Sequence, residues 1–229
     1  MAAEQPTEGA VESRFALTDS QVERLRSFGR QFWRNKKAMI GLSIVLSLFV
    51  VALFAPLIAP YGMNDTNIED RTQAPSLEHP FGTDDLGRDI FSRVVLGSRI
   101  SLYVGLGSIS AALAVGAVTG VVAGYAGGLL DEILMRVMDA AMAFPPVLLA
   151  LTLLVVLGPE LRNVIIALAF VYTPYIARVS RSAALSERNE AYVESAVARG
   201  ESDTRIVFSE VFPNCMAPIL VQGSLNVSF

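Results

Sequence analysis

The run of residues from 38 to 61 contains no Asp, Glu, Lys or Arg. As an α-helix rising 1.5 Å per residue it reaches about 36 Å, which exceeds the ~30 Å hydrocarbon core of a bilayer. An uncharged apolar run of that length predicts a first transmembrane helix. It constrains the chain more than any other feature, because the rest must then fold in or beside a membrane.

Further apolar runs follow the first, and together they predict an all-α, polytopic bundle of transmembrane helices. Composition agrees, because 52% of the residues are hydrophobic and only 17% are charged, far from the balance of a soluble domain. The runs predict spans at about 100–130, 133–156 and 164–176, and the beginning of a fifth at 215–229. This last run of ~15 residues reaches only ~22 Å, so we expect the chain to stop inside a helix, as a C-terminally truncated product.

Charge on either side of the first span predicts its orientation. Lys36 and Lys37 precede the span, whereas Asp65, Glu69 and Asp70 follow it. The positive-inside rule therefore puts the N-terminus in the cytoplasm and makes residues 62–99 an external loop.

Two segments precede the first span. Residues 1–17 are small, polar and acidic, a composition that predicts disorder. In residues 18–37, apolar side chains recur at helical spacing among arginines and lysines, which predicts a cytoplasmic amphipathic lead-in helix lying on an anionic membrane face. The alternative is a solvated basic lead-in to the span.

A polar stretch, residues 192–214, interrupts the apolar runs and predicts two short helices joined by a hinge. Tyr192 and Ala196 contribute to an apolar face on the first helix. Gly200 allows a left-handed or otherwise sharp turn at no steric cost, because it has no Cβ.

The second helix of this stretch has its own boundary signals. Ser202 is its expected N-cap, and Asp203 lies in its first turn, where the helix dipole favours a negative charge. Pro213 should end or kink it. Five arginines cluster around the stretch, on what should be its cytoplasmic side: Arg178, Arg181, Arg188, Arg199 and Arg205.

An ordered, gapped motif runs through the same stretch: Glu194-Ser195-Ala196, then Gly200, then Phe212-Pro213. It resembles the EAA loop of binding-protein-dependent ABC importer permeases. Ser195 stands where that family has alanine, and Glu210 where a branched aliphatic residue is usual. In the family the loop is a cytoplasmic coupling helix that docks on an ATPase subunit, which implies a coupling loop over residues 182–213. An ordinary amphipathic connector between membrane helices is the alternative.

The second half of the external loop carries another motif: Gly82, Thr83, Asp84, Gly87, Arg88 and Asp89. It resembles the C-type signature of the dipeptide, oligopeptide and nickel branch of these permeases. Taken by themselves, the charges predict an ion-pair network that fixes the loop, formed by Asp84, Asp85, Arg88, Asp89, Arg93 and Arg99. A metal or carboxylate site at Asp84 and Asp89 is the weaker alternative.

Small residues four apart mark one face of the second span: Ser108, Ala112, Gly116, Gly120 and Gly124. In lipid such faces let two helix backbones approach closely. This is a predicted helix-packing face, either for a partner permease or for another helix of the same chain.

Pro145 and Pro146 lie within the third predicted span and should kink it, since neither has an N–H to donate. The carbonyls that they free would line a substrate path or bond to a neighbouring helix. Four crossings separate the N-terminus from residues 192–214, which places both on the same, cytoplasmic side.

Absent motifs narrow the mechanism. The sequence has no G-x-x-x-x-G-K-[ST] phosphate loop, so the chain does not itself bind ATP in that manner. It lacks catalytic sets such as Ser-His-Asp, and its single Cys215 and single His79 predict neither a metal site nor a cofactor. We expect no ionisable residue near the middle of a span, which argues against a proton-coupled carrier.

The resemblance implies a permease subunit, not itself an enzyme, of an ATP-driven importer of peptides or similar small solutes. The implied fold is that of type I ABC importer permeases, with six spans, of which five begin here. Implied partners are a second permease subunit, two ATPase subunits or domains, an external solute-binding protein and the lipid bilayer of the cytoplasmic membrane, without nucleic acid. A structural or channel-like membrane protein with no ATPase partner is the alternative function.

Overall fold

The computed structural model describes residues 30–228, which are largely helical. The elements in chain order are α2 (Lys36–Ile58), the 3-10 turn η3 (Ile68–Asp70), α3 (Ile90–Ala126), α4 (Gly128–Met142), α5 (Pro146–Leu157), α6 (Leu161–Glu187), α7 (Ala191–Ala198), α8 (Asp203–Arg205), the π-helical segment η4 (Ile206–Val211) and α9 (Phe212–Val227). Residues 30–228 contain no β-strand, only an isolated bridge between Thr83 and Asp89. The predicted all-α fold class is confirmed.

Several helices are long and apolar enough to cross a membrane. They are α2, α3, α6 and the continuous helix Asp203–Val227, which joins α8, η4 and α9. The pair α4 and α5 passes the same test but bends by 91° at its break, so it is a broken span or a re-entrant loop. The predicted polytopic membrane bundle is confirmed.

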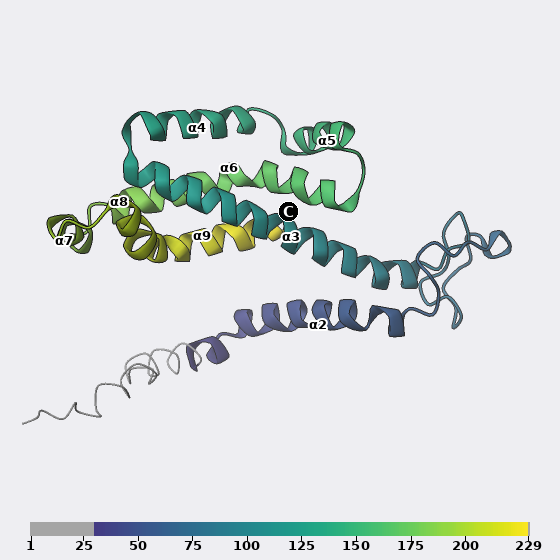
Figure 1. The fold of residues 1–229 in the computed structure, drawn as a ribbon. Coiled ribbons are helices and arrows are strands. Elements are labelled where there is room, and N and C mark those ends of the chain that lie inside the picture. The colour runs from purple at the N-terminus through teal and green to yellow at the C-terminus, as the bar shows by residue number, and fades with distance from the viewer. Residues whose placement is uncertain (1–29, 229) are drawn as a thin grey trace, which may run out of the picture.

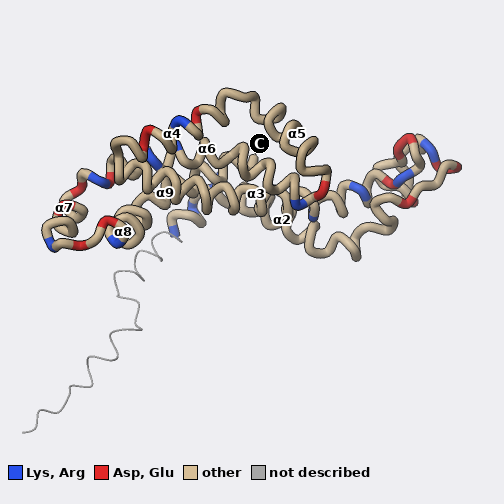
Figure 2. Tube along the Cα trace, turned by 45° about the horizontal axis from the view of Figure 1, so that its top comes forward, with Lys and Arg blue, Asp and Glu red and all other residues tan. Residues whose placement is uncertain are grey.

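Different segments of the chain lie at the two ends of the bundle. Figure 1 shows the start of α2 at the same end as α7 and α8, whereas the loop before α3 lies at the opposite end. Figure 2 shows that charged residues gather at these two ends and are sparse along the helices between them. The even number of crossings expected from the sequence therefore agrees with the arrangement of the chain.

The lead-in segment predicted over 18–37 falls mostly outside the described residues, as does the disordered segment predicted over 1–17. Residues 30–34 are helical, and Asn35 separates them from α2. The Asn35 side chain caps α2 by accepting the backbone N–H groups of Lys37 at 3.1 Å and Ala38 at 3.3 Å.

The core of the bundle is the contact between α3 and α6, because small residues let their backbones meet (Figure 1). A Cβ atom built on Gly120 would lie 2.1 Å from the Ala177 carbonyl oxygen, and one on Gly124 would lie 2.6 Å from the Arg181 carbonyl oxygen. Ser108, Ala112, Gly116, Gly120 and Gly124 are all buried. Of the two partners that the sequence leaves open for this face, α6 of the same chain occupies it.

Two helices extend beyond the predicted spans. α3 begins at Ile90, ten residues before the predicted start at 100, because Asp89 caps it by accepting the Ser92 N–H at 2.7 Å. α6 continues to Glu187, past the predicted limit at 176. In both α3 and α6, helical turns with charged residues extend the apolar part that the sequence predicted as a span.

The prolines of the third predicted span break the helix completely instead of kinking it. Pro145 has extended backbone angles, with φ −56° and ψ 129°, and Pro146 starts α5 at a position where no N–H is needed.

Of the two outcomes predicted for Pro213, ending or kinking its helix, the first does not occur. The helix runs unbroken for 25 residues, and the Phe212 N–H reaches back five residues to the Val207 carbonyl. This wider π-helical turn directly precedes Pro213, where an α-helical turn would press the proline ring against a carbonyl oxygen. The apolar run that was expected to begin near 215 is thus part of a longer helix.

Candidate functional site

Helix α7 has one face inside the protein and one outside. Val193 and Ala196 are 2% and 0% exposed, and they belong to the same buried cluster as Val207 of η4. Glu194 and Ser195 are exposed on the other side. The alternation arises because neighbouring helical residues point about 100° apart, so α7 is anchored by one face and presents the other.

Gly200 ends α7 with the left-handed turn expected from the sequence, at φ +76°. Its N–H donates to the Val197 carbonyl at 2.9 Å, and the next N–H, of Glu201, reaches the Ala196 carbonyl at 3.2 Å. This pair of bonds is a Schellman motif, the common glycine-dependent helix end. No atom lies within 4 Å of a Cβ built on Gly200, so only its backbone angle requires glycine.

The second helix of the loop begins as expected but without a side-chain cap. Ser202 occupies the N-cap position with extended backbone angles, yet its side chain caps no N–H group. Asp203 lies in the first turn and accepts a hydrogen bond of 3.3 Å from the Tyr125 hydroxyl of α3. The loop is thus tied to the end of α3 as well as to its own helices.

Tyr192 connects α7 to the end of α6. Its hydroxyl donates to the Glu187 carboxylate at 2.6 Å, and its ring packs beside the buried cluster. Burial and the Glu187 carboxylate together raise the pKa of Tyr192 to about 12. The hydroxyl therefore stays protonated, as the hydrogen bond to Glu187 needs.

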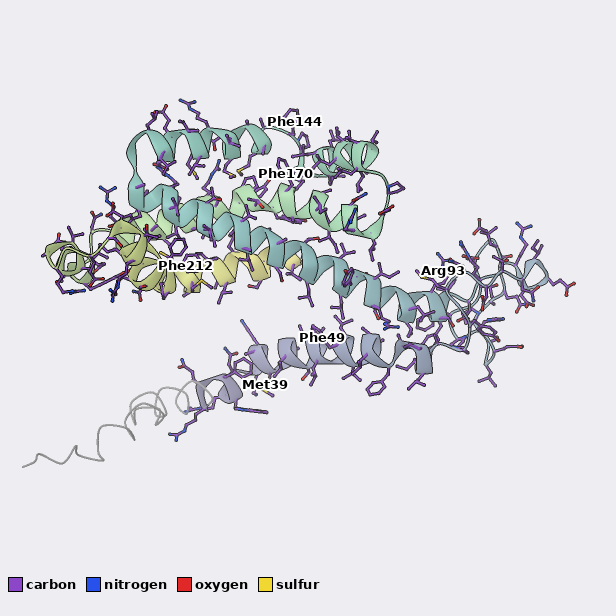
Figure 3. The ribbon with its side chains drawn as sticks, viewed as in Figure 1. Met39, Phe49, Arg93, Phe144, Phe170 and Phe212 are labelled. Carbon is purple, nitrogen blue, oxygen red and sulfur yellow. The ribbon has the colours of Figure 1, made fainter. Side chains whose placement is uncertain are left out.

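A groove of about 520 Å³ runs beside α7. Its wall combines Tyr125 and Val193 with the charged residues Arg188, Glu194 and Asp203. The groove lies at the end of the bundle where α9 starts, which Phe212 marks in Figure 3. The groove and α7 together form an amphipathic surface at that end.

Of the five arginines expected around this loop, four form ion pairs in two groups, and the fifth, Arg188, lines the groove beside α7. Arg199 and Arg205 stay in the loop, where both pair with Glu201 at 2.8 and 3.4 Å. Arg178 and Arg181 pair instead with acidic residues of α4, Asp139 at 2.7 Å and Asp131 at 2.5 Å. These pairs were not predicted from the sequence, although two acids eight apart on one helix are a signal of a shared polar face.

In the loop before α3, Asp84 is the centre of the predicted signature motif. Its carboxylate accepts the Leu86 and Arg88 N–H groups at 2.9 and 3.0 Å and the Arg88 Nε at 2.7 Å. Burial opposes ionisation, but these hydrogen bonds outweigh it and lower the pKa of Asp84 to about 2. Gly82 and Gly87 both have positive φ, and a Cβ on Gly87 would overlap the Asn67 carbonyl oxygen, so glycine is required at that turn.

Asp89 has a different partner from the one expected. Instead of an arginine it meets the lone histidine, with His79 Nδ1 3.1 Å from its carboxylate, and both side chains are buried. Burial works against ionisation, yet the Ser92 and His79 hydrogen bonds lower the pKa of Asp89. The pair and the cap on α3 fasten the loop to the helix that follows.

The remaining members of the predicted network contribute less. Arg93 lies 4.0 Å from Asp84 and donates to the Met63 carbonyl at 3.1 Å, at the loop end of α3 (Figure 3). Within residues 30–228, Asp85 and Arg99 take part in no ion pair. The Thr83 hydroxyl donates to the Asp70 carbonyl, which closes the loop on η3.

Two known protein families match separate segments of the chain. The family described as binding-protein-dependent transport system inner membrane component matches residues 116–229, which include α7 and the Gly200 turn. The family described as the N-terminal TM domain of oligopeptide transport permease C matches residues 24–75.

Curated relatives are similar over most of the chain. A dipeptide transport system permease protein of Alkalihalophilus pseudofirmus is 44% identical, over 90% of this chain and 67% of its own length. An oligopeptide transport system permease protein of Bacillus subtilis is 39% identical, over 86% of this chain and 65% of its own. A di/tripeptide transport system permease protein of Pseudomonas aeruginosa is 38% identical, over 89% and 69%.

Proposed function

The chain belongs to the binding-protein-dependent transport system inner membrane components, in their dipeptide and oligopeptide C-type branch, and from that premise we propose that it is a permease subunit of an ATP-driven peptide importer. Its place is the cytoplasmic membrane, with the N-terminus and α7 in the cytoplasm and the loop before α3 outside. A second permease subunit completes the path, and hydrolysis of ATP occurs on separate chains.

The observation that carries the proposal is the two-faced character of α7. Its outward face combines the polar Glu194 and Ser195 with Val197, whose side chain is 57% exposed. Val197 also lines the groove beside α7 with Tyr125 and Val193, and an apolar groove with a charged rim suits a protein partner. An ATPase subunit binds this face. Glu194 makes a polar contact with the subunit, and Ser195 packs closely against the subunit.

The inward face of α7 supports a role in passing movement on. Ala196 is fully buried in its own chain, so it anchors α7 and is not available to contact an ATPase subunit. Together with Val193 it packs near η4, while Tyr192 is bonded to Glu187 at the end of α6. Displacement of α7 therefore pulls on the helices before and after it.

At the other end of the bundle, the loop before α3 is the proposed contact for an external solute-binding protein. It is held in one shape by the Asp84–Arg88 and Asp89–His79 pairs and by the cap on α3. A fixed loop loses less conformational entropy on binding than a flexible one, which suits a docking surface.

Co-purification tests this function. In mild detergent, the tagged chain should bring down the ATPase subunits and a second permease from cells that make the whole transport system. Replacing Ser195 and Val197 with arginine should remove the ATPase subunits but keep the second permease. Leu77→Arg, at a fully exposed position of the external loop, is the matched control and should keep both.

A chain purified without any ATPase subunit would contradict the proposal and favour a structural or channel-like protein. Retention of the ATPase subunits by the Ser195→Arg, Val197→Arg variant would contradict the role of α7.

A further inference from the structure

Helix α4 is attached to the bundle in an unusual way. None of its 15 residues is buried, whereas α3 and α6 each bury about ten. Two ion pairs attach it to α6. Asp131 accepts both Nε and Nη2 of Arg181, at 2.5 and 2.6 Å, and Asp139 accepts Nη2 of Arg178 at 2.7 Å. Polar contacts thus hold α4, whereas apolar packing holds α3 and α6 together.

The two ion pairs differ in strength. The Asp131–Arg181 pair is bidentate, and its side chains are 13% and 35% exposed. The Asp139–Arg178 pair has a single hydrogen bond, and its side chains are 57% and 56% exposed. A bidentate, partly shielded pair is held more firmly than a single contact exposed to water and ions. The pair near the start of α4 is therefore the fixed one, and the pair near its end is the labile one.

The chain departs from regular helix at both ends of α4. At its start, Gly127 and Gly128 have φ of +65° and +57°, a succession of left-handed angles that only glycine adopts without strain. After it, the chain breaks at Pro145 and bends by 91° into α5. The helix between these two joints is a rigid rod.

An apolar cavity of about 290 Å³ lies under the rod. Val115 of α3, Met138 of α4, and Phe170 and Thr173 of α6 are among its lining residues. Figure 3 shows Phe144 at the break after α4 and Phe170 on α6. The space explains why α4 buries nothing, and it leaves room for the helix to move.

We propose that α4 is a hinged gate that turns about its Gly127–Gly128 end and the Asp131–Arg181 pair, with the Asp139–Arg178 pair as its latch. Eight residues place Asp139 about 12 Å from Asp131, so a turn of about 15° moves it about 3 Å and breaks the latch. Opening widens access to the cavity and to Thr173, the side chain that is buried in it. The role of the gate in transport rests on the proposed function, whereas the movement of α4 does not depend on that function.

The accessibility of Thr173 tests the movement. This residue lines the cavity and is 8% exposed, and its hydroxyl bonds only to the Ala169 carbonyl of its own helix. In the Cys215→Ala background, Thr173→Cys supplies the single thiol of the chain, and N-ethylmaleimide measures its labelling rate in the complete transporter in membranes. Asp139→Asn should raise that rate about two- to fivefold, the range for losing one exposed ion pair.

Matched variants separate the latch from general loosening. Exchanging the charges, with Asp139→Arg and Arg178→Asp, should return the rate toward that of the parent. Glu132→Gln is the control, because the Glu132 carboxylate pairs at 3.5 Å with Arg136 of the same helix and should not affect the rate. An unchanged rate in Asp139→Asn, or an equal rise in Glu132→Gln, would overturn the gate.

A second measurement covers the case in which Thr173→Cys does not fold. Cysteines in place of Asp139 and Arg178, joined by a bifunctional methanethiosulfonate reagent that spans the length of the arginine side chain, should stop peptide uptake until a reductant is added. Normal uptake by the cross-linked chain would refute the gate. Faster labelling in Asp139→Asn without peptide uptake by any variant would leave the gate standing and refute the proposed function instead.

Discussion

Replacing Gly120 with alanine should separate the two central helices. A Cβ at this position would lie 2.1 Å from the Ala177 carbonyl oxygen and 2.6 Å from the Ser180 Cβ. Ordinary contact begins at 3.4 Å, so α3 and α6 would have to part by about 1.3 Å. The obstacle is backbone, which cannot rotate away as a flexible side chain can.

The size of the effect follows from comparison with a glycine that touches nothing. Overpacking of a filled core costs about 1–3 kcal/mol. Gly105, on the same helix, has no atom within 4 Å of the place that a Cβ would take, so Gly105→Ala brings only the helix preference of alanine, worth up to about 1 kcal/mol. Both variants gain this helix preference, so they should differ by the overpacking cost alone, about 1–3 kcal/mol, which corresponds to a melting difference on the order of 3–10 °C.

Thermal unfolding of the detergent-solubilised chain measures this difference. Gly124→Ala, with its nearest contact at 2.6 Å, should fall between Gly120→Ala and Gly116→Ala, whose nearest contact is at 2.8 Å. Equal melting temperatures for Gly120→Ala and Gly105→Ala would refute the close approach of α3 and α6.

Two further predictions concern the two ends of the bundle. Gly200→Asp should leave the protein folded in the membrane, because the site has open space and Asp tolerates a left-handed angle. The variant should nevertheless uncouple ATP hydrolysis from uptake. Normal uptake would count against α7 as the coupling element. In the loop before α3, the pKa of Asp84 falls from 3.8 to about 2, so its contribution to stability is complete above pH 3.8 and disappears as the pH drops through about 2. Hydrogen exchange of the loop should show protection lost over that interval, and an Asp84→Asn chain that loses protection at the same pH would exclude Asp84 as the cause.

The spans were predictable because long apolar runs leave few alternatives. The first span was expected at 38–61 and α2 occupies Lys36–Ile58. The start of α3 was not predictable from apolarity, since its first ten residues include Arg93 and Arg99 and continue the helix outside the apolar run. Helix caps such as Asp89 decide such boundaries, and they act through single hydrogen bonds.

In the candidate site, local backbone requirements were easier to predict than distant contacts. The left-handed turn at Gly200 follows from the residue type alone. By contrast, Arg181 meets Asp131 across 50 positions of the chain, and Asp89 meets the lone His79 after both are buried. Such pairs form only after the helices pack, and the local spacing of residues in a single sequence does not reveal that packing.

Labelling at Ser195 tests the central claim, that α7 is a cytoplasmic contact for an ATPase subunit. In the Cys215→Ala background, Ser195→Cys places a single exposed thiol on the outward face of α7. A membrane-impermeant maleimide should label it in inside-out vesicles stripped of ATPase subunits, and bound ATPase subunits should protect it. Labelling from the outside of intact cells, or labelling that ATPase subunits do not slow, would contradict the account.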